Sequence, residues 1–203
     1  MGHFYFGDVG QYYFGANTSP PSAVGQHTLA LPPSIIPTML QPDVYWVRER
    51  DGIRLAIMPR PRSGEWLSDE IAGWNRLGVQ TVVSLLEPHE VRDLDLANEE
   101  ALCLAAGVKF VSFPIPDRGV PSNLLEFAKL VAKIEQWLRS DESVAVHCRA
   151  GIGRSGLLGA CILAAFGVDP NTAFAVLSRA RGVKVPDTDA QIEWVREYAR
   201  GRP

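Results

Sequence analysis

The chain has 203 residues, of which 46% are hydrophobic and 21% are charged. This is enough for one well-buried domain and too little for two of ordinary size. The formal net charge of −3 excludes the strongly basic surface that nucleic acid or an anionic membrane would require, so any anion site must be local.

Three cysteines are too few for a disulfide framework, which favours a reducing compartment. The sequence has no apolar run of eighteen residues, and it starts without the basic and hydrophobic pattern of a secretory signal. We therefore expect a cytoplasmic protein that does not insert into a membrane.

Residues 1–42 are rich in Gly, Pro, Ser and aromatic residues and are nearly uncharged. Such a composition cannot build a core alone, and it fits either an arm packed on the domain or a segment without structure. The sequence therefore predicts an N-terminal arm over 1–42 and one domain over 43–203.

Regular patterns begin at Val44. In chain order they predict strands at 45–49 and 53–59, a helix at 66–78, a buried strand at 81–86, a helix at 90–107 and a strand at 108–116. Gly78 and Gly107 are expected to end the two helices.

The second half continues the alternation. It predicts a helix at 122–140, a strand at 143–148, an apolar helix at 156–166, a helix from Asp169-Pro170 through Ala180, and a last helix at 188–200. Strands that alternate with helices indicate an α/β fold with a mainly parallel central sheet flanked by helices on both faces. Ligands of such sheets lie beyond the carboxyl ends of the strands, where Cys148 and the loop of Asp117 are expected.

The stretch VAVHCRAGIGRSGLLGAC, residues 144–161, places a glycine turn between a strand and a helix. Gly151, Gly153 and Gly156 match the GxGxxG pattern of dinucleotide sites. Such a site also needs a second strand that ends in an acid about twenty residues later, but the region around Val176 lies in a predicted helix. The phosphate-binding GK[ST] sequence is absent as well, so nucleotide binding is disfavoured.

An oxyanion site explains the same turn better. The glycines allow the backbone amides of the loop to gather at a helix N-terminus, around one tetrahedral oxyanion. The Arg154 guanidinium adds a planar pair of donors, and the positive field favours the thiolate of Cys148, the expected nucleophile. The predicted phosphate-binding residues are Arg149, Ala150, Gly151, Ile152, Gly153 and Arg154.

The sequence HCRAGIGRSG resembles the HCxxGxxRS signature of the cysteine-based protein tyrosine and dual-specificity phosphatases. The resemblance covers roughly 44–200 and implies a dual-specificity-like phosphatase fold that uses neither metal nor cofactor. It implies that Cys148 takes the phosphoryl group, that Arg154 and the loop amides stabilise the transition state, and that Ser155 eases departure of the thiolate. An aspartate protonates the leaving oxygen and then activates water.

The resemblance places that aspartate at Asp117, in FPIPDRGVPS; the alternative is a residue that only opens a turn between Pro116 and Gly119. His147 is expected to support the loop, or to be an ordinary core imidazole. Direct proton transfer to Cys148 is disfavoured because neighbouring strand residues point to opposite faces.

Gln191 resembles the glutamine that positions water in some relatives, but Thr188 and Gln191 also have the spacing of a capping box. Arg181 and Lys184 either frame the pocket mouth or interact with a helix dipole. Cys103 and Cys161 are expected to be inert core thiols, although relatives can form a disulfide with the catalytic cysteine.

The resemblance implies a phosphoprotein phosphatase that acts on phosphotyrosine and also on phosphoserine or phosphothreonine. The loop lacks the lysines typical of inositol-lipid phosphatases, and the sequence shows no aromatic recognition loop like that of deep-pocket tyrosine phosphatases, which favours a shallower cleft. The alternatives are a phosphatase of phosphoinositides or other small monoesters, and a phosphate-binding module with little turnover. A rhodanese-type sulfur transferase also uses a cysteine loop, but it would not need Asp117 or Arg154-Ser155.

Overall fold

The computed structural model describes residues 41–47 and 53–201, which all belong to one compact unit over residues 39–203. The predicted arm over 1–42 lies outside the described residues except for its last two, and it stays a prediction. The second half of the strand predicted at 45–49 also lies outside them.

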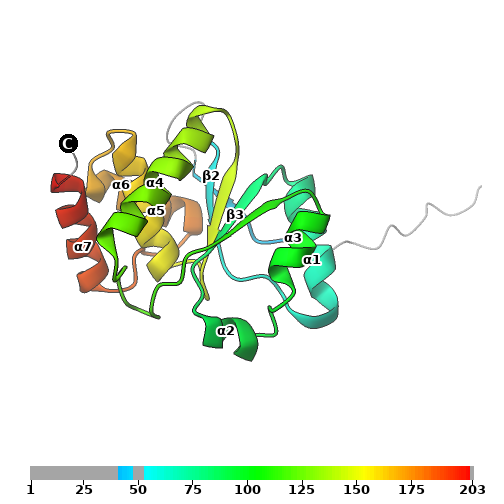
Figure 1. The fold of residues 1–203 in the computed structure, drawn as a ribbon. Helices are drawn as coiled ribbons and strands as arrows, with labels where there is room; N and C mark the ends of the chain where they lie inside the picture. Colours follow the sequence, from blue (N-terminus) through cyan, green and yellow to red (C-terminus); the bar gives the residue numbers. More distant parts are fainter. Residues whose placement is uncertain (1–40, 48–52, 202–203) are drawn as a thin grey trace, which may run out of the picture. The chain divides into compact units, whose positions relative to one another are not determined.

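A five-stranded sheet forms the centre of this unit (Figure 1). Its strands are β1 (Tyr45–Trp46), β2 (Leu55–Met58), β3 (Thr81–Ser84), β4 (Lys109–Ser112) and β5 (Val144–His147). They lie in the order β1-β2-β5-β3-β4, and only β1 runs antiparallel to its neighbour. The mainly parallel sheet is therefore confirmed, with β5 at its centre.

Seven α-helices and one short 3₁₀ helix accompany the strands in the described residues. They are η1 (Gly64–Trp66), α1 (Leu67–Arg76), α2 (Pro88–Asp93), α3 (Glu99–Ala105), α4 (Leu124–Arg139), α5 (Gly153–Ala165), α6 (Pro170–Arg181) and α7 (Asp189–Arg200). Figure 1 shows α4 to α7 on one side of the sheet and α1 and α3 on the other. Helices on both faces were predicted and are confirmed.

The sheet residues divide their side chains between two hydrophobic clusters. Val144 and Val146 of β5 pack with the residues of α4 to α7, while Ala145 packs with those of α1 and α3. This alternation is the two-residue period of a strand with both faces buried. The same alternation continues past the end of β5 and places His147 and Cys148 on opposite faces of the sheet.

Helix α5 lies in the interior because its sequence is apolar all round. Every residue from Arg154 to Leu163 is buried. Gly159 allows close approach to α6, since a Cβ there would lie 3.0 Å from a methyl carbon of Leu177. The helix that starts at the glycine turn is thus held rigidly against its neighbours.

The prediction of one helix over 90–107 is wrong, because the segment forms two helices, α2 and α3. After α2, Asp95 takes a left-handed conformation with φ of 53°, and the Leu96 amide donates to the Val91 carbonyl at 2.9 Å. This is the hydrogen-bond pattern of a Schellman helix end, with aspartate in the place that glycine usually takes. Leu96 thereby enters the core, where 1% of its surface is exposed.

The helix ends predicted at Gly78, Gly107 and Asp169 agree with the structure, whereas α5 starts at Gly153, three residues before the predicted start at 156. Gly78 and Gly107 follow α1 and α3 with φ of 83° and 75°. The Asp169 carboxylate accepts hydrogen bonds from the Asn171 and Thr172 amides at the start of α6, and Pro170 is the first helical residue.

The Asp95→Gly substitution should stabilise the protein by about 1 kcal/mol, because a left-handed residue with a Cβ is strained and glycine is not. Asp95 shows no ion pair or side-chain hydrogen bond among the described residues that the substitution would remove. Urea unfolding measures the difference. Asp93→Gly, inside α2, is the control and should give no gain; a loss of stability in Asp95→Gly would contradict this account.

Candidate active site

Cys148 directly follows the central strand β5, and residues 148–152 connect that strand to α5. Its side chain belongs to the cluster of α4 to α7 and is 3% exposed. The loop passes close over the end of β2: Gly151 has φ of 68°, and a Cβ there would lie 2.4 Å from the Met58 carbonyl carbon. Only glycine allows this approach, which fixes the path of the loop.

Two further contacts hold the loop from outside. The Arg60 amide donates to the Arg149 carbonyl at 3.3 Å, and the Arg181 guanidinium donates to the Ala150 carbonyl at 3.1 Å. Arg181 also packs over the Tyr45 ring, with 4.3 Å between its central guanidinium carbon and the ring centroid. Arg181 therefore supports the back of the loop from the end of α6.

The loop carries a row of backbone donors beside Cys148. In the described part of the chain, the amides of residues 149–155 donate to no protein group, and the first to do so is that of Gly156, to the Ile152 carbonyl at 3.0 Å. Such N–H groups at a helix start form an anion-binding arrangement, which the helix dipole reinforces.

Arg154 lies in the first turn of α5 with only 1% of its surface exposed. Its Nη1 donates to Glu90 Oε2 at 2.5 Å and to the carbonyls of Ile115 and Leu85 at 3.1 and 3.3 Å. Its Nη2 donates to Glu90 Oε1 at 2.9 Å and to Asp117 Oδ1 at 2.9 Å. The guanidinium is thus fixed by Glu90 and by carbonyls beyond β3 and β4.

Hydrogen bonds and neighbouring charges keep Arg154 and Glu90 ionised. Burial acts to lower the pKa of Arg154, but the Glu90 hydrogen bond and the charges of Cys148, Glu90 and Asp117 raise it overall. Burial likewise acts to raise the pKa of Glu90, but hydrogen bonds from Arg154 and the Glu87 amide lower it overall. Sequence reasoning missed Glu90. The sequence did contain a signal for it, because Glu87, followed by Pro88, stands three residues earlier, and Glu87 and Glu90 form a capping box at the start of α2.

Asp117 lies in a tight turn, which is one of the two interpretations that the sequence left open. The Gly119 amide donates to the Pro116 carbonyl at 2.8 Å, and Arg118 has φ of 57°, so Asp117 does lie in a tight turn. Its side chain is 54% exposed and also contacts Arg154. The turn therefore presents a solvent-accessible carboxylate at the guanidinium.

His147 lies on the face of the sheet opposite to Cys148, as strand alternation predicts. It is fully buried near Trp74, and its Nε2 lies 2.9 Å from Glu99 Oε1 at the start of α3. Glu99 is a second buried acid that sequence reasoning missed, and no local motif marks it. The pair lies directly beneath the strand end that carries Cys148.

Ser155 is buried at the same turn of α5. Its Oγ has no hydrogen-bond partner among the described residues. A buried hydroxyl without a partner is costly, so the Ser155 hydroxyl is available to a group outside the described residues.

Gln191 connects the loops around the site. Its backbone amide donates to Thr188 Oγ1 at 3.2 Å, so Thr188 caps α7 as expected. The side chain, however, accepts from the Asp187 amide at 3.2 Å and donates to the Gly119 carbonyl at 2.9 Å. A Cβ on Gly153 would lie 3.1 Å from Gln191 Oε1, so this buried amide contacts both the cysteine loop and the turn of Asp117.

The remaining candidates lie elsewhere. No disulfide joins the three cysteines, all of which are in the described residues and buried. Burial and the charges of Glu99 and Glu100 raise the pKa of Cys103 to about 12, which keeps it a thiol. Residues 41–47 and 53–201 hold no cluster of three metal-ligating side chains, and none of their helices is both long and apolar enough to span a bilayer.

The Gly151→Ala substitution should destabilise the protein by about 1–3 kcal/mol more than Gly167→Ala. Both glycines have positive φ, 68° and 80°, so the backbone strain of an alanine is shared. Only at Gly151 would the methyl group also overlap the backbone of Met58, while Gly167 has open space. Equal losses in urea unfolding would show that the close approach is not what matters.

The Glu90→Gln substitution should flatten the acid side of the pH–stability curve. The pKa of Glu90 is lower in the folded chain than its ordinary value of 4.5. Its ionised form therefore contributes stability above that value, and this is lost as the pH falls through the folded pKa. Denaturant midpoints measured from pH 6 to pH 3 should fall less steeply in Glu90→Gln than in the parent, whereas the exposed control Glu65→Gln should follow the parent. Parallel curves for all three proteins would refute the assignment.

Comparisons with known proteins agree with this geometry. Residues 45–202 match the family described as Swiss Army Knife protein, DSP-PTPase phosphatase domain. A protein of Invertebrate iridescent virus 6, assigned as a tyrosine phosphatase, is 39% identical in an alignment of length 114 that covers 52% of this chain and 42% of that protein. The match thus spans less than half of the length of that relative.

Two solved structures have the same fold. Kinase associated phosphatase, with its catalytic-site cysteine replaced by serine, superposes with a TM-score of 0.70 at 18% identity, over 80% of this chain and 98% of that one. Tk-PTP in the active form gives 0.64 at 26% identity, over 79% and 99%. The chain belongs to the dual-specificity-type protein tyrosine phosphatase family, which its family match, viral relative and fold jointly establish.

Proposed function

We propose that the chain is a phosphoprotein phosphatase that hydrolyses phosphotyrosine, and also phosphoserine or phosphothreonine, through a phosphocysteine at Cys148. The observation that carries the proposal is the fixed Arg154 guanidinium, which Glu90 holds and Asp117 contacts at the loop that follows Cys148. A buried cation, a free row of amides and a thiol in one loop suit a phosphate dianion that is attacked by sulfur.

In the first step, the thiolate of Cys148 attacks phosphorus and the bond between phosphorus and the leaving oxygen breaks. Asp117, displaced from the guanidinium by the phosphate and carrying a proton, gives that proton to the leaving oxygen. Arg154 and the amides of residues 149–154 bind the equatorial oxygens and stabilise the charge of the transition state. Arg149, Ala150, Gly151, Ile152 and Gly153 contribute through their backbone only.

In the second step, a water molecule attacks phosphorus, Asp117 accepts its proton, and the bond between phosphorus and sulfur breaks. The unpartnered Ser155 hydroxyl donates to the departing thiolate. Gln191, whose amide lies against Gly153 and the Asp117 turn, orients the water. His147, packed against Glu99, supports the strand end below Cys148.

The substrate is a phosphorylated protein or peptide, and no metal or cofactor takes part. Support for a protein substrate over an inositol lipid is the loop itself, whose variable positions carry Arg149, Ala150 and Ile152 and no lysine. We place the protein in the cytoplasm, in keeping with three buried cysteines that form no disulfide.

Hydrolysis of p-nitrophenyl phosphate in the presence of EDTA tests the proposal. Cys148→Ser should abolish turnover and still bind a phosphotyrosine peptide, because the amides and Arg154 remain. Asp117→Ala should lower kcat by about 10²- to 10⁴-fold, the usual contribution of a general acid. Cys103→Ala, which removes a thiol on the other side of the sheet, is the matched control and should keep its activity.

Other outcomes would assign the chain differently. Undiminished turnover by Cys148→Ser would exclude the phosphocysteine. Peptide binding by the parent without any turnover would indicate a phosphate-binding module. Sulfur transfer from thiosulfate to cyanide, without phosphatase activity, would indicate a sulfur transferase.

A further inference from the structure

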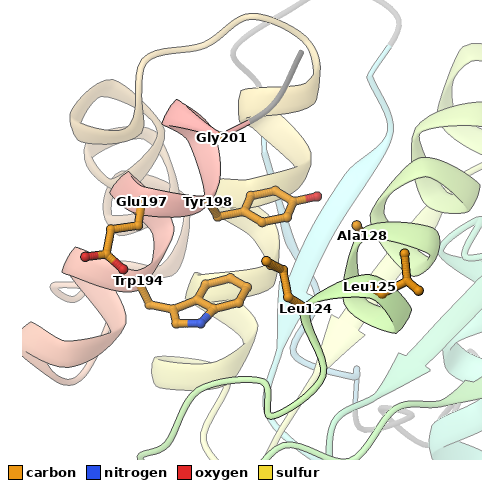
Figure 2. A pocket seen from close by; sticks show the side chains of 7 residues that line it. All are labelled: Leu124, Leu125, Ala128, Trp194, Glu197, Tyr198 and Gly201. Carbon is orange, nitrogen blue, oxygen red and sulfur yellow. The ribbon is translucent and has the colours of Figure 1, made fainter.

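An apolar groove lies between the start of α4 and the second half of α7 (Figure 2). It encloses about 680 Å³ and is lined by Leu124, Leu125, Ala128, Trp194, Glu197, Tyr198 and Gly201. Leu124 and Leu125 are 58% and 65% exposed, the latter being the largest exposure of any large apolar residue described. Apolar surface gathered in a concave site marks an interaction surface rather than chance exposure.

The wall formed by α7 is rigid. The rings of Trp194 and Tyr198 are stacked, with 5.5 Å between their centroids, and both meet the fully buried Phe127 ring edge-on at 4.9 and 5.4 Å. Aromatic side chains fixed in this way lose little entropy when a partner binds, and for this reason they often anchor interfaces.

One uncompensated charge lies at the α7 edge of the groove. Glu197 lines it and has no ion pair among the described residues. The other acids nearby do have partners: Glu193 lies 2.9 Å from an Arg200 nitrogen, and Glu126 lies 2.8 Å from Lys129 Nζ. An occupant that complements this surface carries a large apolar side chain next to a lysine or arginine.

Both walls of the groove lie near residues of the proposed catalytic site along the chain. Helix α4 begins seven residues after Asp117. On α7, Trp194 follows Gln191 by three residues, about 5 Å along the helix axis, and Gln191 is bonded to Gly119 in the Asp117 turn. The helices that form the groove thus start beside the turn of Asp117 and beside Gln191, which favours a segment of the enzyme's own substrate as the occupant.

We propose that the groove binds a segment of the phosphoprotein substrate in which a large apolar residue stands beside a lysine or arginine. This inference rests on the proposed phosphatase function and adds a sequence preference outside the phosphate pocket. Glu197 selects the basic residue, while Leu124, Leu125 and Trp194 receive the apolar one.

Phosphotyrosine peptides test the inference. In one set, a Leu-Arg pair is moved through the ten positions on either side of the phosphotyrosine. At each position, two matched peptides carry Ser-Arg or Leu-Glu in place of Leu-Arg. In the parent, at least one Leu-Arg position should raise kcat/KM about tenfold over both versions. Glu197→Lys should reverse the preference, so that Leu-Glu becomes the better substrate. Glu193→Lys makes the same charge change one turn away, outside the groove, and should keep the preference of the parent.

Hydrolysis of p-nitrophenyl phosphate, which is too small to reach the groove, should be equal in the three proteins. Equal activity without any Leu-Arg preference, or with a preference that Glu197→Lys leaves unchanged, would overturn the inference and leave the phosphatase function standing. No hydrolysis by the parent would instead refute the proposed function. A concentration-dependent dimer in sedimentation that Leu125→Asp abolishes would assign the groove to a second copy of the chain and also overturn it.

Discussion

The buried pair between Arg154 and Glu90 is the interaction on which the arrangement of this site depends. A guanidinium that is 1% exposed must have its charge and its N–H groups satisfied. Glu90 accepts hydrogen bonds from it with both oxygens, and the Leu85 and Ile115 carbonyls and the Asp117 carboxylate accept further ones. These partners lie in α2 and in the segments that follow β3 and β4. One side chain of α5 thus fixes three neighbouring segments around the loop.

The break between α2 and α3 also contributes to the arrangement of this site. A continuous helix from 90 to 107 would carry Glu90 and Glu99 on one rigid rod. With the chain turning at Asp95, Glu90 reaches Arg154 on one side of the strand end, and Glu99 reaches His147 on the other. The two buried acids therefore support consecutive parts of one motif, His147 and the loop after Cys148, from separate helices.

The sequence could predict what is encoded locally. The alternation of β5, the glycines of the loop, the cap at Asp169 and the turn at Asp117 are all properties of neighbouring residues, and each was recognisable. The partners of Arg154, His147 and Gln191 were not, because they lie 64, 48 and 72 residues away and depend on how the elements pack. The helix end at Asp95 was missed because an aspartate occupies the position where glycine is the usual signal.

Asp117 also has a consequence for which anions the loop can accept. Its carboxylate already accepts a hydrogen bond from Nη2 of Arg154. An anion that binds this side of the guanidinium must therefore displace the Asp117 carboxylate. A singly charged ion offers little more than this carboxylate does and gains little by replacing it. A doubly charged group binds the guanidinium more strongly and displaces the carboxylate, and in the proposed mechanism the displaced Asp117 is then free to reach the leaving oxygen.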